Sequence, residues 1–435
     1  MQDFKKLYQE KLTTPEGAAA MLHSGMSTAA DIALAQPYLI YRAIAERVKK
    51  GELTDMVSHV LLDAEPVPFM TDPEVAKNYR GITWFSGAYS RKAVNAGLMD
   101  VMPCYYRDVP SLFSEIVKPD VYCAVVSPMD EHGYFTTGCD HSISDALRDT
   151  AKMILLQVNP NMPRSLGASL IHISEVDALW EDDAALPEIP AAEPDEVGRK
   201  ISEFIVPEIP NGATLQLGIG AVPDAVALGL KGHKHLGCHT EMFTNSMLEL
   251  IKCGAVDNSV KVLDKGKTVA TFAYGTREMY DFIDDNPSFQ ILPVDYVNNP
   301  NIIRQFPNFI SINAAVEVDF FGQVCAEGVG RKHISGTGGQ VDFVRGAVLS
   351  PGGKSFIAFP ATAAHGKVSR IVPALTQGAP VTTGKNDVDY IVTEYGIAAM
   401  RGHTVGQRTK QLIQIAAPQF RDQLTFEAKK ENIII

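Results

Sequence analysis

Glu241 is the carboxylate in this sequence that is best suited to covalent chemistry. It lies in the run HTEMF at residues 239–243, where its neighbours are apolar or small on both sides. Such surroundings desolvate a carboxylate and make it more reactive as a nucleophile. Without that context, a single Glu is more often a solvated surface charge. His239 has no second ligand at metal-binding spacing and is interpreted as structural, and Cys238 as a small core residue.

A glycine turn precedes this carboxylate along the chain. Gly218 and Gly220 follow an apolar strand predicted at residues 214–217, and a helix is predicted from Asp224 to Leu230. Glycine lets backbone N–H groups approach a ligand closely, and a helix N-terminus favours an anion. The dinucleotide fingerprint GxGxxG fails, because Pro223 replaces its third glycine. The segment therefore predicts an anion-binding turn rather than a nicotinamide site, with a turn that binds nothing as the alternative.

A second glycine-rich loop occupies residues 333–343. Gly336, Gly338 and Gly339 fall within four residues, just before the start of a predicted helix or strand. Successive backbone N–H groups in such a loop can hold a phosphate or stabilise an oxyanion. A flexible connection without a ligand is the alternative interpretation. No CxxC pair occurs among the six cysteines, so no zinc site is predicted.

Strands and helices alternate along the chain, and the two halves resemble each other. Alternation of this kind predicts an α/β fold with largely parallel sheets. Three correspondences occur in the same order: predicted strands at 82–85 and 269–272, predicted strands ending at Tyr106 and Tyr296, and Asp-to-Gly turns at 130–133 and 319–322. We therefore predict two similar α/β domains that arose by internal duplication, with ligands at the carboxyl ends of strands.

The segment at residues 180–196 separates these halves. It reads WEDDAALPEIPAAEPDE, which is acidic, contains three prolines and lacks a helical apolar stripe. Such a composition is typical of a linker. The predicted domains are residues 1–185 and residues 186–435, and the second carries Glu241.

Composition excludes several classes of partner. The chain has 435 residues and a formal net charge of -12, which disfavours a nucleic-acid partner because such binding depends on Lys and Arg contacts with phosphates. No run approaches the ~18 apolar residues of a membrane span. Six scattered cysteines without a secretion signal indicate a reducing, cytoplasmic environment.

Six motifs carry a resemblance to a known family. GIGAVPDAV, HTEMF, INAAVEVDFFGQV, SGTGGQVDF, SRIVP and TEYGIAAMRG occur in this order and most densely between about residues 210 and 415. The chain closely resembles the acetyl-CoA hydrolase/transferase family, and within it the 4-hydroxybutyrate, butyrate and acetate CoA-transferases. The resemblance implies two similar α/β domains, coenzyme A as part of an acyl-CoA substrate, short carboxylic acids as partners, no metal, and a homodimer or higher homo-oligomer.

The resemblance also assigns roles to single residues. It implies that Glu241 is the catalytic nucleophile and that Asn313 assists near the reacting centre. Backbone amides of Ile219 and Gly339 would form the oxyanion hole. The residues implied in binding CoA are Gly218, Ile219, Gly220, Ala221, Val222, Gly338 and Gly339. Many relatives carry a glutamate where this chain has Gln36, in a loop expected near the acid pocket.

The implied reaction is CoA transfer between a short-chain acyl-CoA (acetyl, butyryl or 4-hydroxybutyryl) and a carboxylate such as acetate. It would proceed by a ping-pong mechanism through a glutamyl-CoA thioester on Glu241. A short-chain acyl-CoA hydrolase would use the same glutamate but let water attack. A CoA-binding sensor without turnover is the alternative from another class, and a desolvated carboxylate facing an anionic ligand disfavours it.

Overall fold

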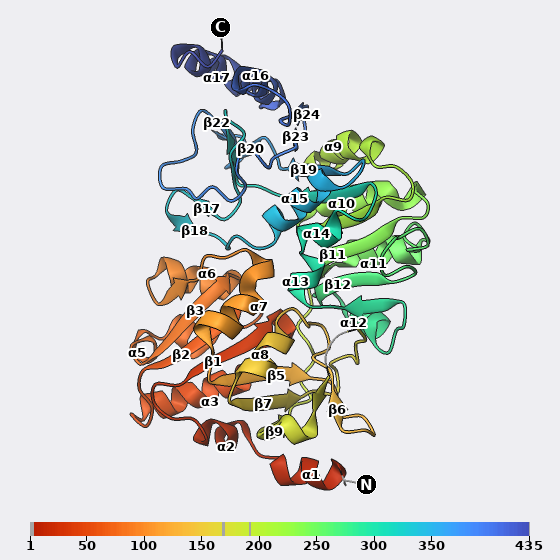
Figure 1. The fold of residues 1–435 in the computed structure, drawn as a ribbon. Helices are drawn as coiled ribbons and strands as arrows, with labels where there is room; N and C mark the ends of the chain where they lie inside the picture. Colours follow the sequence, from red (N-terminus) through yellow and green to blue (C-terminus); the bar gives the residue numbers. More distant parts are fainter. Residues whose placement is uncertain (1–3, 168–169, 191–192, 435) are drawn as a thin grey trace. The chain divides into compact units, whose positions relative to one another are not determined.

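The computed structural model describes residues 4–167, 170–190 and 193–434. The chain divides into two compact units, one made of residues 1–190 and 270–296 and the other of residues 191–269 and 297–435. Figure 1 shows strands and helices alternating along both. Among the helices in the described ranges, none combines the length and the apolar character needed to cross a membrane.

The first sheet has seven strands in the order β4-β3-β2-β1-β5-β7-β9. Each of its neighbouring pairs is parallel. Strand β5 reads VYCAVV and all six of its residues are buried, because a parallel strand is covered by helices on both faces. The strands are β1 (Ser27–Ile32), β2 (Met56–Leu61), β3 (Tyr79–Phe85), β4 (Met99–Val101), β5 (Val121–Val126), β7 (Met153–Val158) and β9 (Ala178–Glu181).

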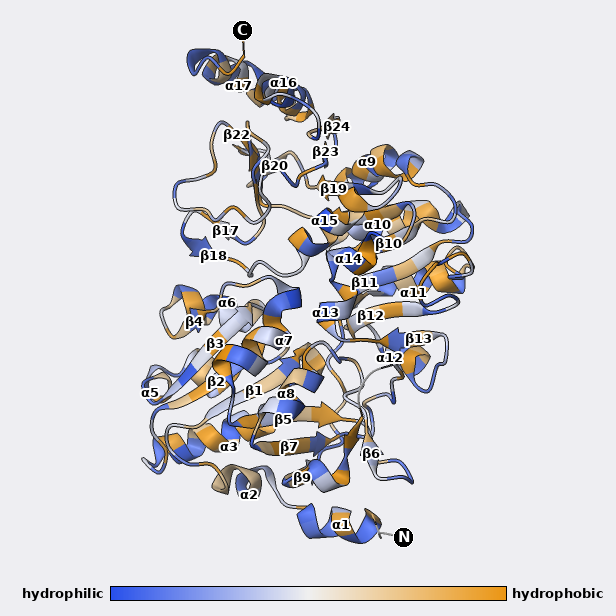
Figure 2. Cartoon of the chain, in the orientation of Figure 1, coloured by the Kyte–Doolittle hydropathy of each residue, from blue (hydrophilic) through white to orange (hydrophobic). Residues whose placement is uncertain are grey.

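Helices precede β1 and occupy connections between these strands. Figure 2 shows apolar residues running along the strands of the sheets and alternating polar and apolar faces on the surrounding helices, the pattern of helices that bury one face. The principal helices of residues 4–190 are α1 (Phe4–Lys11), α2 (Pro15–Ala20), α3 (Tyr38–Lys49), α6 (Ala88–Asn95) and α8 (Ser144–Thr150).

The second sheet has eight strands in the order β13-β12-β11-β10-β14-β19-β23-β24. Strand β10 pairs in parallel with β11 and β14, and the parallel pairing continues through β19 to β23, whereas β24 returns antiparallel to β23. The strands are β10 (Thr214–Leu217), β11 (Gly237–Phe243), β12 (Thr268–Ala273), β13 (Phe289–Ile291), β14 (Phe309–Asn313), β19 (Lys354–Ala358), β23 (Tyr390–Thr393) and β24 (Gly396–Ala399).

Helices precede, connect and follow the strands of this sheet. Helix α9 begins at the N-cap Asp195, whose carboxylate accepts a hydrogen bond of 2.7 Å from the N–H of Gly198. The helices are α9 (Glu196–Ile205), α10 (Ala221–Gly229), α11 (Asn245–Lys252), α12 (Arg277–Ile283), α13 (Val294–Val297), α14 (Pro300–Ile303), α15 (Gln340–Leu349), α16 (Val405–Ile415) and α17 (Pro418–Lys430).

The strand orders confirm the predicted fold class and internal duplication. Counted along the chain, the first sheet runs 4-3-2-1-5-6-7, and the second has the same order with one strand added at its end. Both predicted turns form, with Gly133 donating to the carbonyl of Asp130 and Gly322 to that of Asp319. The predicted strands ending at tyrosines are wrong, because Tyr106 begins a 3₁₀ turn and Tyr296 lies in α13.

The predicted linker begins too early. Trp180 belongs to the edge strand β9 and is almost completely buried, because the three apolar residues of that strand, Ala178, Leu179 and Trp180, all pack into the core. The predicted helix at 224–230 also begins three residues earlier than expected, at Ala221. The domain boundary between residues 185 and 186 stays a prediction.

The topology singles out one place for a ligand. The chain order reverses at β10, since β11 to β13 lie on one side of it and β14 to β24 on the other. In open parallel sheets, ligands bind beyond the carboxyl ends of the strands at such a reversal. The residues at this place are the turn after β10, the end of β11 with Glu241, and the end of β14 with Asn313.

Candidate active site

Glu241 lies within β11, two residues before the end of the strand. Its side chain is half-buried, whereas the other six residues of β11 are buried. The carboxylate is therefore reachable by a ligand while most of its surroundings are protein. An apolar strand rather than a polar loop provides this position, as the neighbours of Glu241 in the sequence indicated.

Two donors hold the carboxylate of Glu241. The side-chain amide of Asn298 donates from Nδ2 to Oε2 at 2.7 Å, and the backbone N–H of Gly339 also bonds the carboxylate. Gly339 is the N-cap of α15 and approaches so closely that a Cβ there would lie 1.9 Å from Oε2 of Glu241 and 2.2 Å from Nδ2 of Asn298. Only glycine fits between these two side chains as they stand.

The pKa of Glu241 reflects these contacts. Burial raises the pKa to about 7, and the hydrogen bonds from Asn298 and Gly339 act in the opposite direction because they favour the ionised form. Near neutral pH the group is thus a more basic and more poorly solvated carboxylate than a surface glutamate. These are properties that favour nucleophilic attack.

If Glu241 attacks as a carboxylate, protonation removes the nucleophile, so we predict that the reaction rate falls as the pH drops below about 7. Asn298→Ala removes a donor to the ionised form, so the pKa of Glu241 rises further and the acid limb of kcat/KM moves to higher pH. The measurement is a profile of kcat/KM against pH for both proteins.

Asn299→Ala is the matched control for this profile. Asn299 accepts a hydrogen bond from the N–H of Asn301 as the N-cap of α14, and its loss should cost about 1 kcal/mol of stability without moving the acid limb. An acid limb that stays in place in a folded Asn298→Ala protein would contradict the assignment.

In the glycine turn after β10, the N–H of Gly218 donates to the carbonyl of Ile312 at 2.8 Å, and the turn leads directly into α10. Gly220 adopts φ +122°, a conformation that favours glycine, and α10 begins directly after it without a side-chain cap. Ile219, between the two glycines, is 52% exposed. The turn can therefore offer N–H groups to an anion or a carbonyl oxygen. The roles expected for residues 218–222 in binding CoA stay predictions.

Asn313 lies beneath this turn and is fully bonded to its neighbours. Its Nδ2 donates to Ser311 Oγ at 2.9 Å and to Gln216 Oε1 at 3.2 Å, and its Oδ1 accepts from Gln216 Nε2 at 3.2 Å. A Cβ at Gly218 would lie 3.4 Å from Asn313 Oδ1. The structure thus places Asn313 in support of the turn, and its role in assisting the reaction stays a prediction.

Asn298 is the residue that sequence analysis missed. The comparison of the two halves had drawn attention to residues 296–300, but for Tyr296 and the proline of that segment rather than for its asparagines. Asn298 is fully buried beside Glu241. An Asn next to a predicted nucleophile can be found from sequence only when the segments that meet in space are known.

The second glycine loop has the predicted form. Gly338 adopts φ +60° and Gly339 leads directly into α15. The helix begins with an N–H group directed at the Glu241 carboxylate, so the positive end of the helix dipole favours the anion there. Gly339 therefore lies against the Glu241 carboxylate, and the expected binding of an oxyanion or of CoA by Gly338 and Gly339 stays a prediction.

A second buried carboxylate cluster lies in residues 1–190. Asp31, on β1, accepts hydrogen bonds from Tyr122 and Ser144, and burial together with Asp140 raises its pKa well above the usual range. Farther along, Gln36 is buried, and its Oε1 has no hydrogen-bond partner among the described residues. The expected position of the Gln36 loop near the acid pocket stays a prediction.

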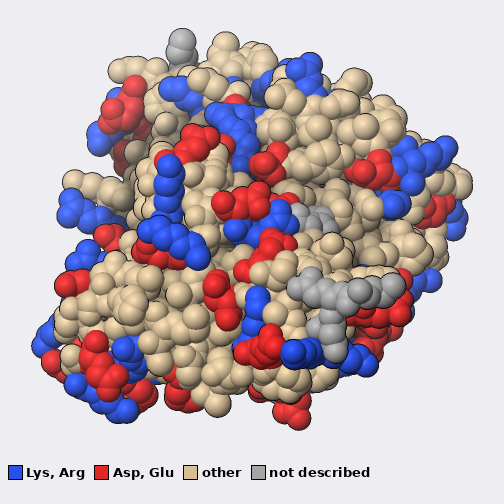
Figure 3. Space-filling model, turned by 60° about the horizontal axis from the view of Figure 1, so that its bottom comes forward, with Lys and Arg blue, Asp and Glu red and all other residues tan. Residues whose placement is uncertain are grey.

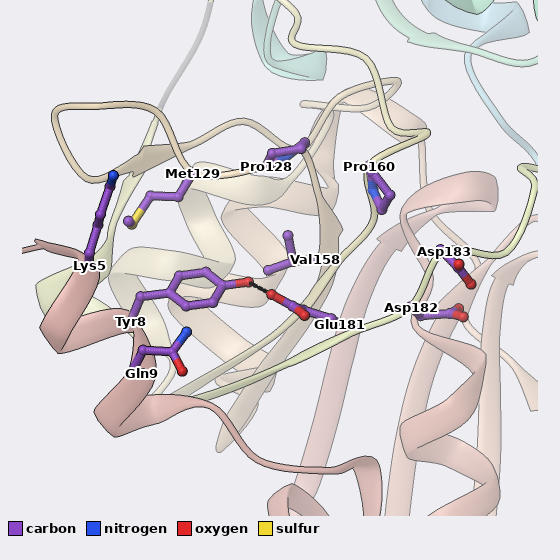
Figure 4. Close-up of a pocket in the computed structure, with 10 residues that line it drawn as sticks. All are labelled: Lys5, Tyr8, Gln9, Pro128, Met129, Val158, Pro160, Glu181, Asp182 and Asp183. Carbon is purple, nitrogen blue, oxygen red and sulfur yellow. Dashed lines mark hydrogen bonds between the residues drawn. The ribbon is translucent and has the colours of Figure 1, made fainter.

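Residues 1–190 also form an open pocket of about 770 Å³ (Figure 4). Its walls come from α1 and from the carboxyl ends of β5, β7 and β9, and Tyr8 donates to Glu181 at 2.8 Å across it. None of the predicted site residues lines it. The pocket is lined by Lys5, Tyr8, Gln9, Pro128, Met129, Val158, Pro160, Glu181, Asp182 and Asp183.

Neither the charges on the face shown in Figure 3 nor the metal-ligating side chains of the described residues mark a further site. On the face shown in Figure 3, basic and acidic side chains are interspersed rather than gathered into a patch of one sign. Within the described residues, no group of three or more His, Cys, Asp or Glu side chains is arranged to hold a metal ion. All six cysteines are free thiols.

Comparison with known proteins gives consistent matches over the whole chain. Residues 1–190 match the Acetyl-CoA hydrolase/transferase N-terminal domain and residues 275–428 match the Acetyl-CoA hydrolase/transferase C-terminal domain. The chain is 43% identical to the 4-hydroxybutyrate coenzyme A transferase of Clostridium kluyveri, with 98% of this chain and 99% of that protein covered. It is 44% identical to the succinyl-CoA:cyclohexane-1-carboxylate CoA transferase of Geobacter metallireducens, with 100% and 98% covered.

A solved structure shows the same architecture. The crystal structure of RipA from Yersinia pestis superimposes with a TM-score of 0.94 at 38% identity, and each chain is covered over 100% of its length. Agreement over full length at this identity means that the whole fold, rather than one domain, is shared.

Proposed function

Because the chain belongs to the acetyl-CoA hydrolase/transferase family as an enzyme of the CoA-transferase type, we propose that it moves CoA between a short-chain acyl-CoA and a carboxylate through a covalent bond to Glu241. One observation carries the proposal. Glu241 is a half-buried carboxylate with a raised pKa, held by Asn298 and Gly339 and still open to a ligand. Binding alone would require no such group.

The first half of the reaction transfers the acyl group to Glu241. A carboxylate oxygen attacks the thioester carbonyl. The backbone N–H groups of Ile219 and Gly339, the second of which bonds the Glu241 carboxylate before the reaction, stabilise the tetrahedral oxyanion. The C–S bond breaks, CoA leaves as a thiolate, and an acyl-glutamyl anhydride remains. Both the nucleophile and the leaving group are anions, so no proton moves and no general base is required.

The second half transfers CoA to the enzyme and then to the acceptor acid. The thiolate attacks the glutamyl carbonyl, the first acid leaves as a carboxylate, and a glutamyl-CoA thioester forms. During this attack, negative charge develops on the glutamyl oxygen, to which Asn298 Nδ2 already donates at 2.7 Å. A donor placed in advance is worth more than one that must reorient. The acceptor acid then reverses the sequence.

The relatives suggest the class of substrate. They are named for 4-hydroxybutyrate, for butyryl-CoA and acetate, and for succinyl-CoA and cyclohexane-1-carboxylate. We infer that this enzyme also accepts carboxylic acids of modest size, such as acetate, butyrate or 4-hydroxybutyrate. We further propose a cytoplasmic homodimer or higher homo-oligomer, consistent with the six free thiols.

Mass spectrometry of the trapped intermediate tests the proposal. We expect the purified protein, mixed with acetyl-CoA or butyryl-CoA, to carry CoA on the peptide that contains Glu241. Borohydride should reduce the thioester and end activity, and an added acid should remove the label as its own acyl-CoA appears. Initial rates should follow ping-pong kinetics.

Two other outcomes would overturn the proposal. Release of free CoA at a rate that ignores the added acid would identify a hydrolase. The absence of both an adduct on Glu241 and any exchange would identify a binding protein without turnover.

A further inference from the structure

His239 lies on the same face of β11 as Glu241, because side chains two residues apart in a strand point to the same side. It is completely buried, and its Nε2 forms a hydrogen bond of 2.8 Å with the backbone carbonyl of Val297. The next residue, Asn298, holds Glu241. His239 and Glu241, which alternate along β11, are thus hydrogen-bonded to the consecutive residues Val297 and Asn298.

The segment at 297–298 depends on this support. Val297 is the last residue of α13, and the final carbonyls of a helix have no partner within the helix. The Oδ1 of Asn298 has no hydrogen-bond partner among the residues that the structure describes. The bond to Glu241 therefore holds the Asn298 amide from one end only, and its position depends on the backbone, which His239 holds at Val297 and the N-cap of α14 holds at Asn299.

The chemistry of His239 suits this role. A carbonyl oxygen can only accept, so Nε2 carries the ring proton. Burial and the nearby Lys261 lower the pKa of His239 to about 3, which keeps the ring neutral. The ring lies 4.9 Å from that of Phe306 and 6.2 Å from that of Phe309, centroid to centroid. Its orientation is therefore fixed by packing.

Lys261 holds the backbone of β11 next to His239. Its Nζ donates to the carbonyl of Cys238 at 2.9 Å and to that of Lys267 at 2.7 Å, and it lies 5.7 Å from the centre of the Phe306 ring. The backbone next to His239 is thus tied in place by a cation that also disfavours a second positive charge on the imidazole.

We propose that His239 is a positioning residue for CoA transfer: it fixes Val297, so that Asn298 holds Oε2 of Glu241 in the position from which the carboxylate attacks. The inference rests on the proposed function of Glu241. It differs from the interpretation of His239 as merely structural, because it predicts that the hydrogen bond, and not only the aromatic ring, matters for the rate.

Three substitutions of His239 distinguish the effect of its hydrogen bond to Val297 from the effect of its aromatic packing. His239→Phe keeps the aromatic packing and removes the N–H donor, so we expect kcat to fall by about tenfold, with KM for acyl-CoA within about twofold of the wild type. His239→Gln places an amide nitrogen near the position of Nε2 and should restore most of kcat. His239→Asn, whose amide is too short to reach Val297, should not.

A matched control is available in the same unit. His233 also bonds a backbone carbonyl, that of Ile209, at 2.9 Å, but neither residue contacts Asn298 or Glu241. His233→Phe should leave kcat unchanged. Thermal unfolding of each variant shows whether it is folded at the assay temperature.

A double-mutant cycle with Asn298→Ala completes the test. If His239 acts through Asn298, the double variant His239→Phe/Asn298→Ala should be no slower than Asn298→Ala alone by more than about twofold. Independent losses that multiply, or a His239→Phe enzyme with wild-type kcat, would overturn the inference. If the wild-type protein itself shows no exchange, the proposed function fails instead, so the two failures are distinguishable.

Discussion

Glu241→Ala is expected to yield a folded protein that has lost CoA exchange. Losing a single oxyanion donor costs about 2.7–4 kcal/mol of the barrier, and losing the nucleophile should cost more, so the rate should fall by more than about a thousandfold. Glu241→Gln should behave likewise, because an amide oxygen is a poor nucleophile. The measurement is the rate of CoA transfer from acetyl-CoA or butyryl-CoA to a second carboxylate.

Glu241→Gln should not destabilise the fold at alkaline pH. The pKa of Glu241 in the folded protein is above its ordinary value, so the folded state binds this proton more tightly than the unfolded state. Stability from this group is fully present below the ordinary pKa and is lost as the pH rises through about 7. Glu241→Gln removes that loss, so its Tm should equal or exceed the wild-type value at pH above 7.

Retention of more than about a tenth of the activity by Glu241→Ala would exclude Glu241 as the nucleophile.

Gly339→Ala is expected to be the second most damaging change, although it adds only one methyl group. The new Cβ would lie 1.9 Å from Oε2 of Glu241, and that atom is the far end of a flexible side chain rather than backbone. The carboxylate can therefore move away and the protein should still fold. A displacement of about 1 Å in a reacting group can cost roughly a hundredfold in rate, so kcat should fall by about that factor.

Gly384→Ala is the matched control for this experiment. No atom lies within 4 Å of the position that its Cβ would take, and its φ is not positive. Both variants should unfold near the wild-type Tm, while only Gly339→Ala loses kcat. If Gly339→Ala kept wild-type kcat, the close approach of α15 to Glu241 would have no part in the reaction.

Much of the fold could be predicted because it depends on local patterns. Apolar strand runs such as VYCAVV, glycine turns after strands and repeated order in the two halves gave the α/β class and the duplication. The errors occurred where tertiary burial outweighs composition. Trp180 looked like part of an acidic linker, yet it is buried in the edge strand β9.

In the candidate site, too, some features could be predicted from local sequence and others depend on the tertiary structure. Glu241 and the glycines at 218, 220, 338 and 339 were identified because side-chain type, backbone freedom and neighbouring residues are properties of short segments. These residues could therefore be singled out from the sequence, whereas their roles follow from the family resemblance and stay predictions.

Only the tertiary structure decided which groups meet the carboxylate. Asn298 is 57 residues from Glu241 along the chain and donates to it at 2.7 Å, because the segment after α13 lies beside β11. The raised pKa of Glu241 and the bond from His239 to Val297 have the same origin. Burial and hydrogen bonding depend on distances in space, which residue types and their spacing along the chain do not specify.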